Sequence, residues 1–314
     1  MKINLTQNKN FKLFKIISKV AQENNQTVYI VGGYVRDLLM QRKAPTDIDF
    51  VTEQSGIELA KAVGKELGDL KVSVFKTYGT AMIKYKDLDL EFVGARKESY
   101  SEDSRKPAVE TGTLEDDQKR RDFTVNALAI SLNAENFGEL IDPFNGREDM
   151  QNKILRTPLE PAQTYSDDPL RMMRAIRFAS VLHFNIEENS LEAIKQEAER
   201  IKIVSMERIM VEFNKIMLSE KPSVGLKLME ETTLLEKIIP ELTALRGIEE
   251  VEGQTHKDNF WHTLEVVDNI SKNTDNLWLR WAALLHDIGK APTKKFVEKI
   301  GWTFHGHEFL GSKM

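Results

Sequence analysis

Two aspartates separated by one residue stand in an apolar stretch, shortly after a pair of glycines. The segment reads VYIVGGYVRDLLMQRKAPTDIDFV, from Val28 to Val51. The runs before the glycines and around the aspartates are typical of short strands, and the residues between them favour a short helix. Side chains at i and i+2 of a strand point to the same face. Asp47 and Asp49 are therefore predicted to lie side by side, with Ile48 and Phe50 turned toward a core.

This pattern predicts a site for a metal and a phosphate. Two adjacent carboxylates repel each other unless a cation neutralises them, and oxygen ligands suit Mg²⁺, which takes its other ligands from water and phosphate. Gly32 and Gly33, between strand and helix, let backbone N–H groups approach a phosphate. Arg36 lies one turn into the helix. A polar surface strand beside a glycine turn would explain a lone D-x-D equally well, but it does not explain the whole segment.

Composition limits the class of protein. The chain has 314 residues, enough for two or three domains. Its net charge of -5 argues against a broadly basic nucleic-acid coat, although a local basic groove stays possible. Cysteine is absent, which excludes disulfides and thiolate metal sites and fits a reducing compartment. No signal peptide is evident, and no apolar run reaches the roughly 18 residues of a membrane span. We expect a cytoplasmic protein without membrane contact.

The residue pattern along the chain changes twice. Short β-rich runs mixed with helical patterns predict a first domain at residues 1–149. Long amphipathic patterns predict a helical domain at 150–253, and histidines gather in a third segment, 254–314. The polar stretch KESYSEDSRKPAVET, residues 97–111, is expected to be a mobile loop.

Several motifs together resemble one known family. GGYVRD followed by TDIDF resembles the nucleotidyltransferase head of bacterial tRNA CCA-adding enzymes and of their relatives, the bacterial poly(A) polymerases. The segments EFVGAR, RRDFTVNALA, IDPFNGREDM, DDPLRMMRAIRFA and SMERIMVEF resemble further motifs in the family's order, so the resemblance covers about residues 27 to 215. It implies an α+β fold, with a polymerase-β-like head on a mixed sheet followed by all-α neck and body segments.

The resemblance also implies a role for the acidic residues. In such enzymes two metal ions act on an in-line displacement, one at the primer 3′-hydroxyl and one at the triphosphate. Asp47 and Asp49 would be the metal ligands, with Mg²⁺ as the metal. Glu91 is the expected third carboxylate, although Asp89 is close by and faces the same way.

Other residues are expected to hold the incoming nucleotide. Arg121 can donate a bidentate fork to phosphate. Asp122 and Asn126, which would share one face of a helix, are expected to serve the ribose or to order the site. Without the resemblance, a solvated helix start with Asn126 as a cap would be the simpler interpretation. The full set of expected nucleotide-binding residues is Gly32, Gly33, Arg36, Arg121, Asp122, Asn126, Asp168, Arg171, Arg174 and Arg177.

The segment DDPLRMMRAIRFA allows two interpretations of Asp168. Asp168 before Pro169 is typical of an N-cap before a first-turn proline. The arginines that follow on a largely buried helix would need an anionic partner, which a nucleotide could supply. By resemblance, Asp168 and Arg171 would read the edge that cytosine and adenine share, an amine next to a ring acceptor. Asp167 stands where the family usually has glutamate, which leaves its role open.

The motifs do not by themselves separate CCA addition from poly(A) addition. Poly(A) polymerases of this class usually carry a basic G-[RK]-[RK]-F stretch, which VSVFKTYGTAMIKY at residues 72–85 lacks, and YSEDSRKP at 100–107 resembles the flexible loop of CCA-adding enzymes. We therefore expect template-independent addition of C, C and A to the 3′ end of tRNA from CTP and ATP. The alternatives are a poly(A) polymerase, an enzyme for only the A-adding or CC-adding half, and an RNA-binding relative with an inactive site. Candidate tRNA-binding patches are KRR at residues 119–121 and the lysines of KPSVGLK at 221–227, which a plain solvated surface would explain equally well.

The last segment resembles an HD-type metal-dependent phosphohydrolase module. Its histidines and aspartate suit a divalent transition metal, and the expected ligands are His262, His286, Asp287 and His307. Because such modules need a distal aspartate and the sequence stops at Met314, the module is expected to be truncated.

Overall fold

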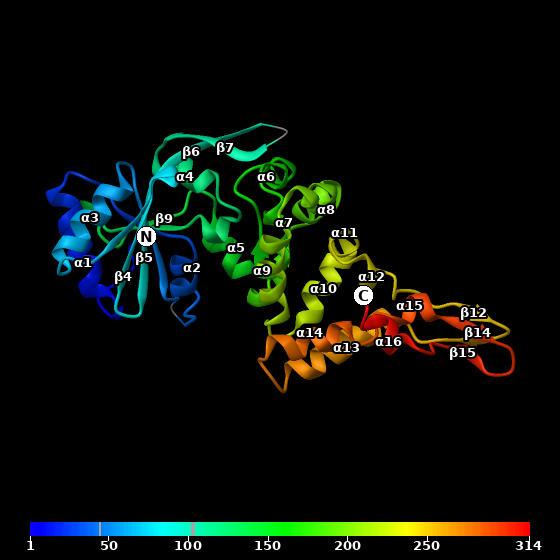
Figure 1. Ribbon diagram of the computed structural model, residues 1–314. Helices are drawn as coiled ribbons and strands as arrows, with labels where there is room; N and C mark the ends of the chain where they lie inside the picture. Colours follow the sequence, from blue (N-terminus) through cyan, green and yellow to red (C-terminus); the bar gives the residue numbers. More distant parts are fainter. Residues whose placement is uncertain (44, 102–103) are drawn as a thin grey trace. The chain divides into compact units, whose positions relative to one another are not determined.

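The computed structural model describes residues 1–43, 45–101 and 104–314. The chain divides into two compact units, Met1–Glu160 and Pro161–Met314 (Figure 1). Among the described residues, no helix is both long and apolar enough to cross a bilayer.

The first unit is built on a mixed sheet whose strands follow the order β3-β4-β5-β2-β1-β8-β9. The strands are β1 (Tyr29–Val31), β2 (Asp47–Thr52), β3 (Val72–Phe75), β4 (Thr80–Tyr85), β5 (Leu88–Gly94), β8 (Ala129–Ser131) and β9 (Leu140–Ile141). β2 and β5 run parallel, and the other neighbours pair antiparallel. A mixed sheet is what the sequence predicts for this unit.

Two helices cover one face of this sheet, α1 (Phe11–Glu23) and α3 (Gly56–Glu66) (Figure 1). Their apolar faces share one core with the sheet, and Ile48 and Phe50 of β2 are completely buried in it. The ring of Phe50 stacks on Phe92 of β5 with centroids 4.9 Å apart. The predicted alternation along β2 is confirmed, because Asp47 is exposed and Asp49 half-buried on the opposite face.

Shorter helical elements complete the first unit. They are α2 (Gly33–Leu39), α4 (Leu114–Lys119), α5 (Gly146–Asn152) and the 3₁₀ turns η1 (Lys76–Tyr78), η2 (Thr124–Asn126) and η3 (Ala134–Asn136). A short strand, β10 (Ile154–Leu155), follows α5.

The stretch expected to be a mobile loop is instead a β-hairpin. β6 (Arg96–Ser101) and β7 (Ser104–Thr111) pair antiparallel, with an irregularity between Ser99 and Ser101. Residues 102–103, inside the segment compared with a flexible loop, lie outside the described residues. A polar two-stranded ribbon is held by backbone hydrogen bonds, which hydrophobic periodicity does not report. The sequence pattern therefore missed it.

The second unit is mainly helical, as predicted. Its helices are α6 (Pro161–Asp167), α7 (Leu170–Leu182), α8 (Glu188–Glu197), η4 (Ala198–Ile203), α9 (Met206–Met217), α10 (Pro222–Glu231), α11 (Leu234–Ile238), α12 (Pro240–Thr243), α13 (Asn259–Ser271), α14 (Leu277–Leu285), α15 (Lys290–Thr293) and α16 (His307–Gly311). Its strands are β11 (Asn185–Ile186) and the hairpins β12 (Glu250–Val251) with β13 (Gln254–Thr255) and β14 (Lys295–Val297) with β15 (Gly301–Thr303).

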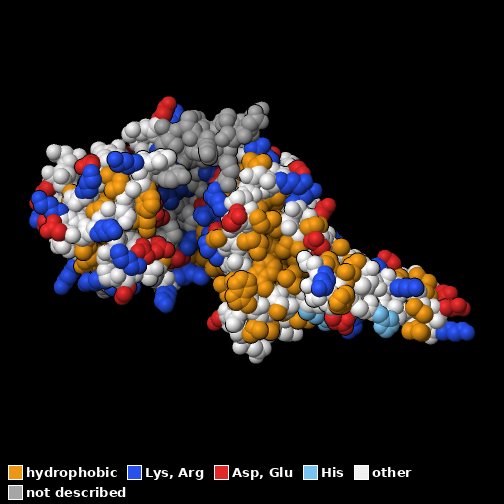
Figure 2. All heavy atoms as spheres, viewed as in Figure 1, with side chains coloured by type: hydrophobic (Ala, Val, Ile, Leu, Met, Phe, Trp, Pro, Cys, Tyr) orange, Lys and Arg blue, Asp and Glu red, His pale blue; other side chains and the backbone are white. Residues whose placement is uncertain are grey.

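Buried contacts join α14 to α9 in this unit. Phe213 stacks on Trp281 with ring centroids 4.9 Å apart, and the buried Arg280 donates to the carbonyl oxygens of Met217 and Ser219. Figure 2 shows apolar side chains gathered on the visible face of this unit. Among its exposed apolar residues are Val211 of α9, Leu218 at the C-cap of α9, and Trp278 and Leu279 of α14.

Candidate active site

The pairing of β2 with β5 brings acidic side chains of the two strands together. Their parallel register sets Asp47 opposite Asp89 and Asp49 opposite Glu91. Asp89 is bound to Lys84 of β4, with Nζ 2.8 Å from Oδ1. Glu91 instead interacts electrostatically with Asp49 and Asp47 on the neighbouring strand. This difference favours Glu91 over Asp89 as the third carboxylate beside the two aspartates.

The electrostatics of this acidic group suit a cation. Burial raises the pKa of the Asp49 carboxyl, the charge of Arg121 opposes that rise, and Asp47 adds to it. Burial and then the charge of Asp49 raise the pKa of Glu91. Both shifts disfavour the charged forms of the two carboxyls, and a bound cation would oppose them. A donor set made only of carboxylate oxygens fits a hard divalent cation such as Mg²⁺.

The register of β1 places the glycine turn next to Asp49. Val31 pairs with Asp49 on one side and with Ala129 on the other, so Gly32 lies between the aspartates and the segment that leads into β8. Gly32 has a φ of +74° and is the N-cap of α2. A Cβ atom there would lie 2.9 Å from Nη1 of Arg121 and 3.6 Å from Oδ2 of Asp49. The missing side chain therefore leaves room for an arginine and a carboxylate to approach over the turn.

The segment RRDFTVNALA does not form the helix assumed for it. α4 ends at Lys119, and only the 3₁₀ turn η2 follows before β8. Asp122 and Asn126 nevertheless meet, because Nδ2 of Asn126 donates to Oδ1 of Asp122 at 3.0 Å. Nη1 of Arg36 donates to Oδ1 of Asn126 at 2.7 Å. The predicted neighbours are therefore in contact, through a tight turn and a hydrogen-bond chain that reaches Arg36, whose Nε also donates to Oδ1 of Asp37 at 2.9 Å.

Residues of IDPFNGREDM determine the conformation of this turn. The hydroxyl of Thr124 donates to Asp149 at 2.7 Å. A Cβ on Gly146 would lie 2.2 Å from the carbonyl oxygen of Thr124, so only glycine allows α5 to pack this closely. Asp142 accepts from the backbone N–H of Gly146 at 2.7 Å. These long-range contacts explain why a turn replaces the expected helix, and sequence spacing gives no sign of them.

In the second unit, α7 starts one residue later than the proline pattern predicts. Pro169 is the N-cap residue and Leu170 the first helical residue. Oδ1 of Asp168 accepts from the backbone N–H of Leu170 at 3.3 Å, which is a capping contact. Arg171 donates from Nη1 to the carbonyl oxygen of Thr164 at 3.3 Å. Both interpretations of Asp168 are compatible with this geometry.

The arginines further along α7 pack on an aromatic ring. The guanidinium carbon of Arg177 lies 4.0 Å from the ring centroid of Phe178, and that of Arg174 lies 5.5 Å from it. Arg177 also forms an ion pair with the buried Glu212 of α9, with Nε 2.8 Å from Oε2. Arg177 therefore has an anionic partner inside the protein, so its burial does not by itself require a nucleotide. Glu212 belongs to SMERIMVEF, but the sequence did not identify it as that partner.

The predicted HD ligands form a cluster around Asp287. Ligand atoms of His262, His286 and Asp287 all lie within 4.8 Å of one another. Nε2 of His307 lies 3.5 Å from Oδ1 of the aspartate. Lys290 also reaches this carboxylate, with Nζ 2.7 Å from Oδ2. All four predicted ligands are thus brought together, beside one lysine that the sequence did not suggest.

Backbone carbonyls orient two of these imidazoles. Nδ1 of His286 lies 2.8 Å from the carbonyl oxygen of Ala283, and Nδ1 of His307 lies 2.8 Å from that of Phe304. Because a carbonyl only accepts, each Nδ1 donates, and in the neutral ring Nε2 then carries the lone pair that a metal would need. Such outer hydrogen bonds are usual behind metal-binding histidines, so the residues fit a transition metal.

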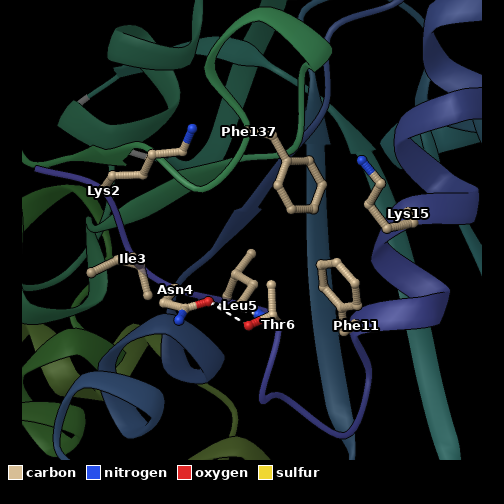
Figure 3. Close-up of a pocket in the computed structure, with 8 residues that line it drawn as sticks. All are labelled: Lys2, Ile3, Asn4, Leu5, Thr6, Phe11, Lys15 and Phe137. Carbon is tan, nitrogen blue, oxygen red and sulfur yellow. Dashed lines mark hydrogen bonds between the residues drawn. The ribbon is translucent and has the colours of Figure 1, made fainter.

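A pocket in the first unit holds none of these residues. It has a volume of about 310 Å³ and is lined by Lys2, Ile3, Asn4, Leu5, Thr6, Phe11, Lys15 and Phe137 (Figure 3). Nζ of Lys15 lies 4.6 Å from the ring centroid of Phe137, so a lysine of the pocket already packs on that ring.

Three family models match the chain in succession. They are the poly A polymerase head domain at residues 28–156, the probable RNA- and SrmB-binding site of polymerase A at 183–245, and the HD domain at 259–314. These matches confirm the resemblance seen in the motifs.

Named relatives and solved structures agree with the models. The A-adding tRNA nucleotidyltransferase of Aquifex aeolicus is 34% identical over 301 residues, which are 91% of this chain and 34% of that enzyme. The CCA-adding enzyme of Bacillus velezensis is 35% identical over 283 residues, 90% of this chain and 65% of that enzyme. A tRNA-processing enzyme solved in an apo form has a TM-score of 0.72 at 30% identity, covering 92% of this chain and 74% of that one.

The chain thus spans between one third and two thirds of the length of these two curated relatives. The structural similarity extends over both units, and the motifs, the acidic residues on adjacent strands and the order of the matched domains agree with one another. The chain belongs to the family of tRNA nucleotidyltransferases and bacterial poly(A) polymerases.

Proposed function

We propose that this chain adds C, C and A to the 3′ end of tRNA, from CTP and ATP and without a template. The observation that carries the proposal is the group of Asp47, Asp49 and Glu91 on adjacent strands, beside a glycine turn and Arg121. The names of the relatives support tRNA as the substrate, and we propose that the protein acts in the cytoplasm. We also propose three domains at residues 1–149, 150–253 and 254–314; the matched domains support their order, and the head match runs on to residue 156.

Each residue of the site has a part in this reaction. Enzymes of this family use a divalent metal, and Asp47, Asp49 and Glu91 would hold it here, as Mg²⁺. When bound, the metal activates the attacking hydroxyl and neutralises charge on the triphosphate. Arg121 and Arg36 donate to phosphate oxygens of the incoming nucleotide. Asn126 and Asp122 fix the orientation of Arg36 through their hydrogen bonds.

Incorporation of labelled CTP tests this proposal against two alternatives, a poly(A) polymerase and an inactive RNA-binding relative. The proposed enzyme incorporates CTP into tRNA that lacks its CCA end. A poly(A) polymerase extends RNA with ATP and needs no CTP, and an inactive RNA-binding relative incorporates nothing. Absence of CTP incorporation with Mg²⁺ present would overturn CCA addition. Because the first named relative is an A-adding enzyme, addition of A alone is the second candidate function.

We further propose that Asp168 and Arg171 select the base. Asp168→Ala is expected to narrow the preference for CTP and ATP over UTP and GTP by about tenfold, because a lost base contact costs about 1–3 kcal/mol. The measurement is the ratio of kcat/KM values for the four nucleotides. If Asp168 only caps α7, the variant loses about 1 kcal/mol of stability and keeps its preference. Glu187→Ala is the control, because Glu187 caps α8 in the same unit by accepting from Ser190 N–H at 2.9 Å.

We also propose that His262, His286, Asp287 and His307 hold a divalent transition metal. Calorimetric titration with Ni²⁺ or Mn²⁺ should show one site in the wild-type chain and a large loss of affinity in His286→Ala. His305→Ala is the control, because His305 is exposed and outside the cluster. Equal affinities in all three proteins would contradict this site. Phosphatase activity that depends on the added metal and on His286 would give the module a hydrolytic function as well.

A further inference from the structure

A buried carboxylate outside the predicted site lies against the arginine of that site. Asp117 of α4 is completely buried, with 0% of its surface exposed. Its Oδ2 accepts from Nε of Arg121 at 3.1 Å and lies 3.0 Å from Nη2, and its Oδ1 accepts from Arg120. Burial alone would raise the pKa of Asp117, but the charges of Arg121 and Arg120 outweigh it, and the net pKa is lowered. The carboxylate is therefore ionised at neutral pH.

Asp117 binds only one side of the Arg121 guanidinium. Asp117 takes the Nε and Nη2 side of the guanidinium, which leaves Nη1 on the opposite side. Nη1 faces Gly32, at 2.9 Å from where a Cβ would be, and its hydrogen bond to the carbonyl oxygen of Asn126 is long, at 3.4 Å. One side of Arg121 is thus held by the protein, and the other is turned toward the glycine turn and Asp49.

Stability alone does not explain a carboxylate in this place. Burying ionised groups costs desolvation energy that the pairing often only offsets, and apolar replacements of buried ion pairs are often as stable. A guanidinium on a flexible side chain loses less entropy on binding phosphate when its orientation is already fixed.

We propose that Asp117 is a positioning residue, which holds the Arg121 guanidinium over Gly32 so that Nη1 donates to a phosphate oxygen of the incoming nucleotide. This inference rests on the proposed function, because it assumes that the site binds CTP and ATP.

The test compares two neighbouring aspartates of α4. Asp117→Asn keeps the shape of the side chain and removes the charge that holds Arg121. Asp116→Asn is the matched control, since Asp116 accepts from the N–H of Thr113 at 2.9 Å in the helix cap and has no part in holding Arg121. We expect Asp117→Asn to raise KM for CTP and ATP about tenfold or more, the effect of a lost charged hydrogen bond, with a smaller change in kcat. Asp116→Asn should lower the melting temperature slightly and leave KM unchanged.

A double-mutant cycle separates positioning from a merely structural role. If Asp117 acts through Arg121, Asp117→Asn adds little to the loss caused by Arg121→Gln. Independent, additive losses in nucleotide affinity would overturn the inference, as would an Asp117→Asn protein that melts earlier but keeps its KM. If Asp117→Asn does not fold, Asp117→Glu keeps the charge but displaces the guanidinium, and the same rise in KM is expected.

Calorimetric binding of ATP to the same proteins keeps this test distinct from that of the proposed function. A wild-type chain that binds ATP but transfers nothing would overturn the proposed function, while the binding constants of the variants would still decide the role of Asp117. A wild-type chain that binds neither ATP nor CTP would overturn both.

Discussion

Replacing Asp49 by asparagine is expected to reduce nucleotide addition about a thousandfold, because charge stabilisation worth several kcal/mol is lost and each 1.36 kcal/mol is a factor of ten. The carboxylate is half-buried, and its pKa is raised by burial. The nearby charge of Arg121 opposes this rise, and an asparagine side-chain oxygen cannot replace the carboxylate as an anionic ligand. tRNA affinity should stay within a few-fold, because the role proposed for this side chain is at the reacting groups and not at the body of the RNA. Single-turnover rates and tRNA binding measure the two effects.

The choice between Glu91 and Asp89 supplies an internal control for this prediction. Glu91→Gln should reduce the rate by a similar factor. Asp89→Asn, two residues away on the same face of β5, should keep most of the activity, because its carboxylate is already paired with Lys84. Turnover retained in both Asp47→Ala and Asp49→Ala would show that these aspartates do not carry the chemistry.

Gly32→Ala is expected to reduce kcat/KM about a hundredfold and to destabilise the fold by about 1–3 kcal/mol, the usual cost of a sparsely populated φ/ψ combination at a residue with a side chain. The added Cβ would meet Nη1 of Arg121 at 2.9 Å. Because Asp117 holds the other side of this guanidinium, the arginine can only move away from the site. Nucleotide KM and thermal melting report the two effects separately.

The adjacent glycine is the control for this substitution. A Cβ on Gly33 would meet Nη2 of Arg36 at 3.7 Å, an ordinary contact, and its φ is not among the positive values. Because alanine keeps the backbone N–H through which Gly33 is expected to bind phosphate, Gly33→Ala should keep most of the activity. If both substitutions have the same small effect, the close approach over Gly32 is not important for function.

Where the signal was local, the sequence predicted the structure well. Two-residue alternation correctly placed Asp47 and Asp49 on one face of β2 and Ile48 and Phe50 in the core. The alternation could not separate Glu91 from Asp89, which share a face. The salt bridge from Lys84 makes that distinction, and it depends on how β4 pairs with β5.

Where tertiary contacts decide, the sequence was a poorer guide. Spacing of four residues placed Asp122 next to Asn126 for the wrong reason, because the packing of Gly146 and the bond from Thr124 to Asp149 make a turn and not a helix. Asp117 had a usable signal, since an aspartate three and four residues before two arginines is typical of helix ion pairs. Such a pair is usually solvent-exposed, and only the structure reveals that this carboxylate is completely buried.

The most direct measurement of the central claim supplies two tRNA substrates, one ending before CCA and one ending after CC, with CTP and ATP given separately and Mg²⁺ present. We predict that CTP extends the first substrate by two residues and that ATP extends the second by one, with each product resolved on a sequencing gel. Addition of ATP to the second substrate alone would assign only the A-adding half of the reaction to this chain. Long A-tracts on both substrates, or no extension of either, would contradict CCA addition.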